Sequence, residues 1–230
     1  MQNKKISIII PVFNEEGIKE FISDLIKKSD KYNIEIIVVD GDSSGSTISK
    51  LKNFPVKTII SPKGRGVQLE KGAKNSTGEL LLFLHADTQL PEDFYPVIIS
   101  ACFNITPCGA FRIKIGSDRF IFRIIEFFAN MRAKYLGMPF GDQAMFISRE
   151  AYEKTGGFSP IPIFEDVDIV RRLKMNNYHI HILDRQVLTS ARRWEKEGIL
   201  RTTLRNWYLQ MLYFIFKINP HKLQKFYRSP

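Results

Sequence analysis

The stretch Ile6-Ser-Ile-Ile-Ile-Pro11-Val-Phe-Asn14-Glu15 decides the fold, because a strand-like apolar run ends abruptly in polar residues. Two later runs have the same form: residues 34–39 end at Asp40, and residues 80–84 end at His85-Ala86-Asp87. In an open parallel α/β sheet, ligands bind in the crevice beyond the carboxyl ends of the strands. The three polar ends therefore predict one site, and its carboxylates suit a metal ion and a phosphate-bearing ligand.

The first hundred residues alternate between strand-like and helix-like segments. Apolar runs at residues 5–11, 34–39, 56–60 and 79–84 predict strands. Between them, Asn14 is a candidate helix cap, residues 64–76 form a basic helical stretch, and Pro91 opens another helix. This alternation predicts right-handed crossovers and a mostly parallel sheet.

The alternation loosens after residue 105. Strands are expected at residues 108–115, 144–147 and 180–188, and helices at residues 119–136, 165–176 and 198–217. The sequence contains no internal repeat, low-complexity tract or linker. We therefore predict a single α/β domain over residues 1–230, with a Rossmann-like sheet flanked by helices and a C-terminal amphipathic helix.

Composition bounds the class of protein. The chain has 230 residues, of which 44% are hydrophobic, enough for one large domain with a core. Its formal net charge of +10 favours phosphate-rich partners such as a nucleotide, a nucleic acid or an anionic lipid. The two cysteines, Cys102 and Cys108, flank apolar segments and are expected to be buried free thiols.

A signal peptide and a transmembrane helix are not expected from the sequence. Residues 1–5 lack the apolar stretch of a signal peptide, and no run reaches the ~18 apolar residues of a transmembrane helix. The expected location is the cytoplasm, with peripheral attachment to the inner face of the membrane as an open alternative.

Two positions are candidates for nucleotide binding. Asp40 follows a strand, where a carboxylate can accept hydrogen bonds from a ribose or a base edge. Arg65 lies between Gly64 and Gly66 at a helix start, where backbone amides and a guanidinium can approach a diphosphate. The alternative for Asp40 and Asp42 is a purely structural Asx turn.

His85-Ala86-Asp87 is the candidate metal site. Mg²⁺ in nucleotide enzymes takes one or two protein carboxylates and fills its coordination sphere with phosphate oxygens and water, so Asp87 is sufficient. His85 is either a second ligand or a core histidine, and we favour the core histidine because the two side chains share a face only in a regular strand.

Glu165-Asp166-Val167-Asp168 opens a helix and has two interpretations. The acids match the helix dipole, or one of them is a general base for an acceptor hydroxyl. The preceding Gly156-Gly157-Phe158 adds a hinge and an aromatic face, as a sugar-binding loop needs.

In their order along residues 5–195, these motifs resemble family 2 glycosyltransferases of the GT-A fold. The resemblance rests on residues 7–15, residues 38–47, Arg65-Gly66, His85-Ala86-Asp87, and Gly157-Phe158 with Glu165-Asp166. It implies a UDP- or GDP-linked sugar donor, a divalent metal (Mg²⁺ or Mn²⁺) and inversion at the anomeric carbon. The donor half is then about residues 1–105, the acceptor half about 106–195, and a C-terminal helical segment covers 196–230.

The resemblance also assigns roles residue by residue. Asp87 matches the last acid of the DXD metal motif, with His85 in place of the first acid. Asp166, with Glu165 before it, matches the catalytic base of the Glu-Asp motif. The nucleotide-contacting and diphosphate-contacting positions are Pro11, Asn14, Glu15, Asp40, Asp42, Arg65, Arg193 and Trp194.

A narrower resemblance is to a subgroup of small bacterial members associated with arsenosugar biosynthesis. It rests on His85-Ala86-Asp87, Gly141-Asp142-Gln143 and the string Ser190-Ala-Arg192-Arg193-Trp194. Processive synthases carry Gln-x-x-Arg-Trp, whereas this chain has Ser190 at the Gln position. A polysaccharide synthase is therefore not expected.

The mechanism that the resemblance implies starts with Asp166 removing a proton from the acceptor hydroxyl. The metal at Asp87, together with Arg192 or Arg193, stabilises the departing diphosphate. We also expect an acceptor-side role for residues 119–136 and the turn at residues 141–143, although the aromatic residues of that helix also suit a core.

Two other classes of function compete with this one. A sugar-phosphate nucleotidyltransferase needs a glycine-rich basic loop after the first strand, where this chain has Val12-Phe-Asn-Glu-Glu16. A non-enzymatic module that binds RNA or membrane has no need of Asp40, Asp87 and Asp166 in one cleft. We therefore expect no nucleic-acid partner.

The C-terminal helix has two interpretations of equal weight. Its aromatic residues and flanking bases suit an anionic membrane interface, which would fit a lipid-linked acceptor. The other interpretation is packing on the domain or on a second subunit in a homodimer.

Overall fold

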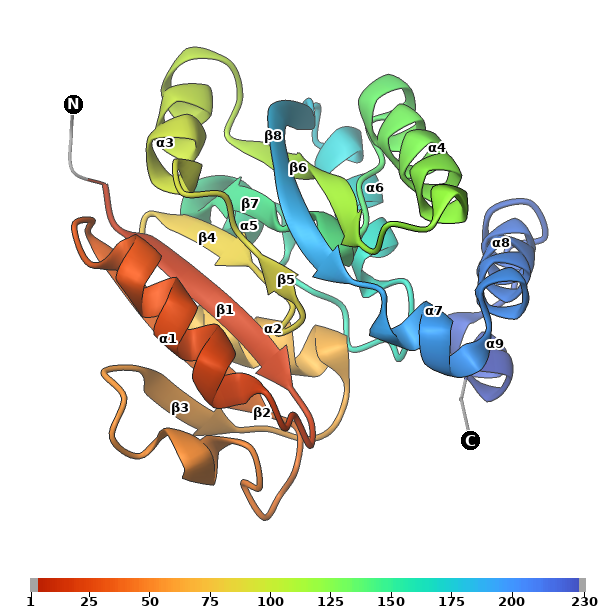
Figure 1. The fold of residues 1–230 in the computed structure, drawn as a ribbon. Coiled ribbons are helices and arrows are strands. Elements are labelled where there is room, and N and C mark those ends of the chain that lie inside the picture. The colour runs from red at the N-terminus through yellow and green to blue at the C-terminus, as the bar shows by residue number, and fades with distance from the viewer. Residues whose placement is uncertain (1–3, 228–230) are drawn as a thin grey trace.

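The computed structural model describes residues 4–227, so residues 1–3 and 228–230 of the predicted domain lie outside the described part. Within it, one eight-stranded sheet has the order β3-β2-β1-β4-β7-β6-β8-β5 (Figure 1). The strands are β1 (Ile6–Val12), β2 (Ile34–Asp40), β3 (Lys57–Ile60), β4 (Leu80–Phe83), β5 (Thr88–Gln89), β6 (Cys108–Gly116), β7 (Met145–Ser148) and β8 (His181–Ser190).

The sheet is parallel from β3 to β4 and changes direction at β7. Strands β3, β2, β1 and β4 are parallel neighbours. Strand β7 is antiparallel to both β4 and β6, whereas β6 and β8 pair in parallel. The predicted α/β class with a mostly parallel sheet is confirmed, and the reversal at β7 explains why the alternation weakens after residue 105.

Helices cover both faces of the sheet (Figure 1). One core joins α1 and α3 to alternate residues of β1 and β4, and the other joins α2, α5 and α6 to the opposite face. The helices are α1 (Ile18–Ser29), α2 (Arg65–Lys74), α3 (Phe94–Asn104), α4 (Phe120–Leu136), α5 (Arg149–Thr155), α6 (Glu165–Met175), α7 (Arg192–Glu197), α8 (Ile199–Phe214) and α9 (Pro220–Tyr227), with 3₁₀ turns η1 (Ile48–Leu51) and η2 (Gly141–Gln143). Cys102 and Cys108 are free thiols, as predicted, but only Cys108 is buried and Cys102 is partly exposed.

Two helix predictions were wrong in detail. Asn14 does not cap α1, which begins at Ile18 after Gly17; Asn14 has φ +50° and its side-chain oxygen accepts a bond from the Ser46 hydroxyl. The expected helix over residues 198–217 starts at Ile199 and ends at Phe214. Gly198, with φ +88°, separates it from the short α7, and that conformation favours glycine.

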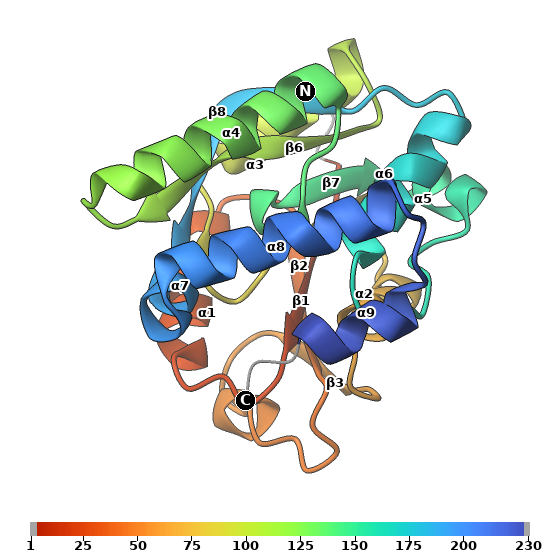
Figure 2. The same ribbon diagram turned by 90° about the vertical axis from the view of Figure 1, so that its right-hand side faces the viewer.

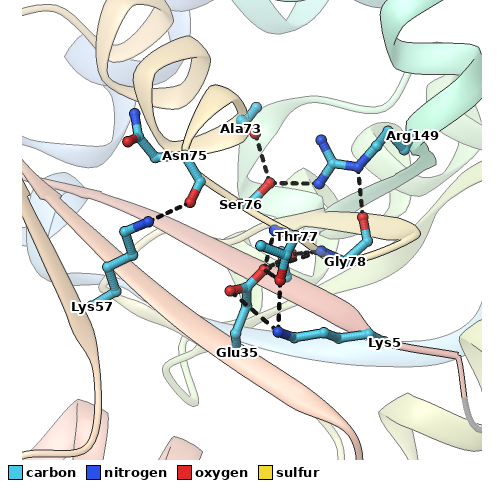
Figure 3. Close-up of polar contacts among 10 residues, drawn as sticks. Lys5, Glu35, Lys57, Ala73, Asn75, Ser76, Thr77, Gly78 and Arg149 are labelled. Atoms are coloured by element: carbon cyan, nitrogen blue, oxygen red, sulfur yellow. Dashed lines mark hydrogen bonds and ion pairs between the residues drawn. The ribbon is translucent and has the colours of Figure 1, made fainter.

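A polar network closes the amino-terminal edge of the sheet (Figure 3). The Glu35 carboxylate accepts bonds from the Ser7 hydroxyl and from the backbone amides of Thr77 and Gly78. The Lys5 ammonium lies 3.5 Å from the same carboxylate. The network joins β1 and β2 to the turn that precedes β4, and so fixes the register of the parallel strands whose other ends form the site.

Candidate active site

A cavity of about 160 Å³ lies at the carboxyl edge of the sheet. It collects side chains from the start of α2, the segment after β4, the η2 turn, the start of α6, the end of β8, and helices α7 and α8. The residues that line it are Arg65, His85, Asp87, Phe140, Gly141, Asp142, Ile163, Phe164, Asp166, Thr189, Ser190, Arg193, Trp194, Asn206, Leu209 and Gln210. Six of the predicted site residues therefore meet in one cavity: Arg65, His85, Asp87, Asp166, Arg193 and Trp194.

Asp166 is held rigidly in the cavity by backbone donors. Its Oδ2 accepts a bond from the Gly141 amide at 2.7 Å, and its Oδ1 accepts one from the Val167 amide at 2.8 Å. Helix α6 begins directly after Phe164, which has φ +63°. A non-glycine residue in this region of φ is uncommon and is found at sites where the surrounding structure enforces it. Here the strained residue turns the chain so that Asp166 faces the cavity.

Gly141 allows the η2 turn to approach the acids and His85. A Cβ atom at this position would lie 2.9 Å from Nε2 of His85 and 3.4 Å from Oδ2 of Asp166. The first distance is too short for a side chain, so a larger residue here would displace the turn or the His85 imidazole, whereas the second is an ordinary contact. The glycine therefore sets the spacing between η2, the segment after β4 and the start of α6.

Glu165 lies behind the cavity and positions Arg65. Its Oε1 is 2.7 Å from Nε of Arg65, and the residue is only 2% exposed. Burial raises the pKa of Glu165, and the Arg65 guanidinium opposes that shift. A Cβ at Gly66 would lie 2.4 Å from the Ser159 carbonyl oxygen, so the second glycine of the predicted motif lets α2 begin against the loop that precedes α6. Arg65 reaches the cavity because of these two contacts.

His85 and Asp87 lie side by side along the cavity wall but differ in environment. Burial, followed by the Arg65 guanidinium, lowers the pKa of His85, and the charges of Asp87 and Asp166 oppose that shift. His85 is therefore neutral near pH 7, the form in which imidazole binds metals. Asp87 is exposed, and one of its oxygens accepts a bond from the Thr88 hydroxyl at 3.2 Å.

Asp142 adds a further carboxylate to the cavity. Burial raises its pKa to about 6, the Arg132 guanidinium opposes that shift, and Asp166 and Asp87 reinforce it. Arg132 itself lies over the Phe140 ring, 3.3 Å from the ring centroid. The predicted acceptor-side turn at residues 141–143 is thus part of the cavity wall.

The remaining predicted nucleotide contacts lie outside the cavity wall. Asp40 is fully buried, and its carboxylate accepts bonds from the amides of Asp42, Thr47 and Ile48 at 2.9–3.2 Å. It therefore shapes the loop after β2. Hydrogen bonds from Ser44, the hydroxyl first, hold the pKa of Asp42 down to about 2, as in an Asx turn.

Neighbouring arginines at the start of α7 have different surroundings. Arg193 lines the cavity. Arg192 instead lies 3.1 Å from Oε1 of Glu15, so it ties α7 to the loop after β1. Pro11 and Asn14 belong to the same loop region. Of the two arginines, only Arg193 is part of the cavity wall.

Sequence reasoning missed the contribution of α8. Asn206 and Gln210 lie four residues apart and therefore on one side of the helix, and together with Leu209 they line the cavity. The available signal was this pair of amides in an otherwise aromatic segment. Phe164, which stacks on Tyr213 with ring centroids 4.8 Å apart, connects the end of α8 to the start of α6.

Comparison with known proteins identifies the family. The model of "Glycosyl transferase family 2" matches residues 7–156, well over half of the chain. The chain belongs to glycosyltransferase family 2. The match covers β1 to the end of α5, and hence the segments that carry Arg65, Asp87 and Asp142.

Curated relatives are longer than this chain. A dolichol-phosphate mannosyltransferase of Pyrococcus furiosus is 35% identical over 121 residues, which is 50% of this chain and 31% of the relative. The "Probable glycosyltransferase YdaM" of Bacillus subtilis is 26% identical over 218 residues, 84% of this chain and 51% of the relative. The chain thus spans between about a third and a half of these relatives.

Solved structures share the fold at low sequence identity. A mannosyltransferase from Pyrobaculum calidifontis, in complex with GDP-Man and Mn²⁺, has a TM-score of 0.67 at 18% identity, over 99% of this chain and 66% of that chain. The glucosyl-3-phosphoglycerate synthase of Mycobacterium tuberculosis, in complex with phosphoglyceric acid, has a TM-score of 0.55 at 18% identity, over 80% and 70%. These matches confirm the GT-A-like architecture.

Proposed function

We propose that the protein is an inverting glycosyltransferase that moves a sugar from a nucleoside diphosphate to an acceptor hydroxyl. The observation that carries this proposal is the gathering of Asp87, Asp166 and Arg193 around one cavity at the carboxyl edge of the sheet. A nucleotidyltransferase or a non-enzymatic basic module would have no use for that set, and neither accords with family 2 membership.

The donor is a UDP- or GDP-linked sugar in this proposal. The loop after β2, ordered by Asp40, forms the nucleotide end of the site, and Asn14 and Glu15 from the neighbouring loop adjoin it through Ser46 and Thr47. Arg65 and Arg193 lie farther along and face the diphosphate. The neighbour bound to GDP-Man supports a nucleotide-sugar donor for a chain of this fold.

A divalent cation, Mg²⁺ or Mn²⁺, fits the donor set of the cavity when the nucleotide shares in its coordination. The described residues include no group of three or more His, Cys, Asp or Glu that could hold a metal unaided. Exposed Asp87 supplies one carboxylate, and neutral His85 is available as a second ligand. When bound, the cation would neutralise charge on the diphosphate.

Asp166 is the general base of the proposed reaction. Its Gly141 and Val167 hydrogen bonds hold it in place, and the carboxylate takes the proton of the acceptor hydroxyl. The acceptor oxygen forms a bond to the anomeric carbon from the face opposite the diphosphate. The bond to the diphosphate oxygen breaks, and its electron pair leaves with that group, stabilised by Arg193. Glu165 acts through Arg65 as a positioning residue.

The test is a panel of nucleotide sugars, each incubated with and without Mn²⁺. Ligand-detected NMR identifies the donor that binds, and NMR of the anomeric proton in the product gives the stereochemistry of transfer. We expect one UDP- or GDP-sugar to bind in a metal-dependent way and the product to have the inverted anomeric configuration. Retention of configuration would contradict the mechanism with Asp166 as base. Membership of the arsenosugar-associated subgroup stays a further proposal on the motif strings alone.

We also propose attachment to an anionic membrane surface, on a specific observation. Helix α4 exposes apolar side chains at Phe120, Ile124, Phe127, Phe128, Met131 and Tyr135. Helix α8 and the residue after it repeat the same spacing at Leu200, Leu204, Trp207, Tyr208, Met211 and Ile215. All twelve are between 39% and 76% exposed, and α4 and α8 run side by side (Figure 2). Paired apolar stripes of this kind mark interaction surfaces.

The C-terminal helix also packs on the domain, through buried Thr202 and Leu209. One side of α8 therefore packs on the domain, and the opposite, exposed side is available for a membrane surface. No helix among residues 4–227 has the length and apolarity needed to cross a membrane. Exposed bases near the stripes, such as Arg201, Lys222 and Lys225, suit anionic lipid.

Co-sedimentation with anionic liposomes tests this attachment. Binding should fall with salt and should drop when Arg201, Lys222 and Lys225 are changed to Gln. Arg205→Gln is not part of the set, because Arg205 lies 2.6 Å from Glu197 in an ion pair that holds α7 to α8. Absence of binding to anionic vesicles at low salt would contradict the membrane proposal.

A further inference from the structure

A second cavity, of about 280 Å³, adjoins the reaction cavity. Five residues line both: Phe140, Asp142, Trp194, Asn206 and Gln210. From these shared residues the second cavity extends between α4 and α8, which lie next to each other in Figure 2. The two helices touch at Phe128 and Trp207, whose rings meet edge to face with centroids 6.3 Å apart. The two cavities therefore adjoin each other across these five residues. We call the part of the second cavity beyond the shared residues the α4–α8 groove.

The groove differs from the reaction cavity in chemistry. Its wall is built from apolar side chains of β6, α4 and α8. These are Ile113 and Ile115 from β6, Ile125, Phe128 and Ala129 from α4, and Trp207 from α8. Arg132 and Thr203 add two polar side chains to this wall, and the rest of the wall beyond the shared residues is hydrocarbon. A cavity with apolar walls favours an apolar occupant over water. A ligand that fills both compartments needs a polar end and an apolar end.

The junction of the two compartments holds a buried donor and a buried acceptor. Nε1 of Trp194 and Oδ1 of Asn206 have no hydrogen-bond partner among the described residues, 4–227. Leaving such groups unpaired costs free energy, so they are candidates for ligand contacts. An indole N–H donates and an amide oxygen accepts, and a hydroxyl can satisfy both. A phosphate dianion has no proton to donate to Asn206.

We propose that the acceptor is an amphiphile: its hydroxyl-bearing head lies between Trp194 and Asn206, and its apolar chain lies in the α4–α8 groove. This inference rests on the proposed glycosyl transfer and names the class of acceptor, of which an alkyl glycoside or a glycolipid is an example. The head is delivered beside Asp166, and the chain extends from it into the groove between α4 and α8.

The chain provides its own reporter for this proposal. Trp194 and Trp207 are its two tryptophans. Trp207 lines the groove and Trp194 lies where the groove meets the reaction cavity, so tryptophan fluorescence reports ligand binding in both compartments. The probes are methyl, hexyl and octyl β-glucoside, each below its micelle concentration. Each added methylene group should lower the dissociation constant by about fourfold until the groove is filled. Equal affinity for the methyl and octyl glucosides would overturn the proposal.

Variants separate the groove from the head site. Ala129→Phe fills the groove and should remove the gain from chain length, whereas Leu200→Ala, on the exposed side of α8, should bind like wild type. Thr203→Phe blocks the groove from the other helix and serves if Ala129→Phe does not fold. Asn206→Leu should weaken all three glucosides by a similar factor. Unchanged octyl glucoside affinity in a folded groove-filling variant would overturn the groove assignment.

Two comparisons complete the test. Octyl phosphate should bind more weakly than octyl glucoside, and tighter binding of the phosphate would overturn the hydroxyl head. Calorimetric titration of GDP and UDP with Mn²⁺ on the same samples tests the donor site independently. If a nucleotide binds but glucoside affinity does not depend on alkyl chain length, the groove assignment alone is overturned. If glucoside affinity depends on chain length but no nucleotide binds, the proposed transferase function alone is overturned.

Discussion

The two edges of the sheet handle buried polar groups in opposite ways. At the amino-terminal edge, the Glu35 carboxylate accepts a hydrogen bond from the Ser7 hydroxyl. The Thr77 amide and the Lys5 ammonium lie against the same carboxylate (Figure 3). At the carboxyl edge, Glu165, Trp194 and Asn206 each keep a buried polar atom without a partner in the described part of the chain. At the first edge the chain itself satisfies the Glu35 carboxylate, although the Ser29 hydroxyl nearby has no partner in the described part of the chain. At the second edge, two of these three residues, Trp194 and Asn206, line the candidate cavity.

The helices show a parallel contrast. Helix α1 covers the donor half with buried Ile18, Ile22 and Leu25 facing the core. Helices α4 and α8 cover the acceptor half and leave aromatic stripes exposed. The buried apolar side chains of α1 stabilise the fold. The exposed apolar side chains of α4 and α8 are unfavourable in water, and apolar patches of this kind mark interaction surfaces.

The largest expected effect comes from Asp166 at the carboxyl edge. Asp166→Asn removes the carboxylate that accepts the proton but keeps a side-chain oxygen that can accept the hydrogen bond from the Gly141 amide. Turnover should fall by ~10²-fold or more, while nucleotide affinity stays near wild type. Steady-state kinetics and calorimetry on the same variant measure the two quantities.

Asp168→Asn is the matched control, since Asp168 follows two residues later on the same helix. Its Oδ2 accepts bonds from the Ser159 hydroxyl and from Arg172, so it is a structural residue. The variant should lose thermal stability and retain most of its turnover. If Asp168→Asn abolishes turnover while Asp166→Asn is mild, the base is Asp168 instead.

A smaller effect is expected at the loop after β2. Asp40→Ala removes the carboxylate that accepts bonds from three backbone amides, so the loop should lose its order. Nucleotide affinity should then fall about tenfold even without metal, which is roughly the effect of losing one hydrogen bond to a charged group. Asp118→Ala, at an exposed position in the acceptor half, controls for the lost charge. Calorimetry in EDTA measures the effect, and unchanged affinity would remove Asp40 from the donor site.

The smallest effect is expected at the amino-terminal edge. Burial tends to raise the pKa of Glu35, but hydrogen bonds from Ser7 and Thr77 outweigh it and the net pKa is lowered. The carboxylate therefore stabilises the fold above the unfolded pKa of ~4.3, and this contribution is lost as the pH falls through the lower folded value.

Glu35→Gln should accordingly lower the melting temperature by a few degrees at pH 7, and the gap to wild type should narrow in acid. Nucleotide binding should not change, since the residue is at the edge away from the site. Thermal melts from pH 7 to pH 3 give the profile. A gap that widens in acid would show that the carboxylate is not the stabilising form.

The sequence was informative wherever local signals were sufficient. Apolar runs that stop at Asp40 and Asp87 predicted strand ends, and parallel pairing then put them at one edge. Arg65 and Asp166 were predicted because helix starts have local signatures. For Asp40 the sequence left a nucleotide contact and a structural Asx turn open. It could not decide between them, because the hydrogen bonds of the carboxylate depend on the backbone of residues 42–48.

Long-range packing was the part that sequence could not supply. Nothing local indicates that α8 returns across the carboxyl edge and brings Asn206 into the cavity. The cap at Asn14 failed for the same reason, because its partner is Ser46, 32 positions away in the chain. Residues whose roles depend on such contacts need the structure.

The central claim is that the carboxyl edge binds a nucleoside diphosphate together with a divalent cation. The most direct measurement is calorimetric titration of GDP and UDP into wild type and Asp87→Asn, with and without Mn²⁺, with Asp118→Asn as the charge control. The account predicts that Mn²⁺ strengthens binding of one nucleotide in wild type and in Asp118→Asn, and that this gain is lost in Asp87→Asn. No binding of either nucleotide to wild type, or the same Mn²⁺-dependent gain in Asp87→Asn, would contradict it.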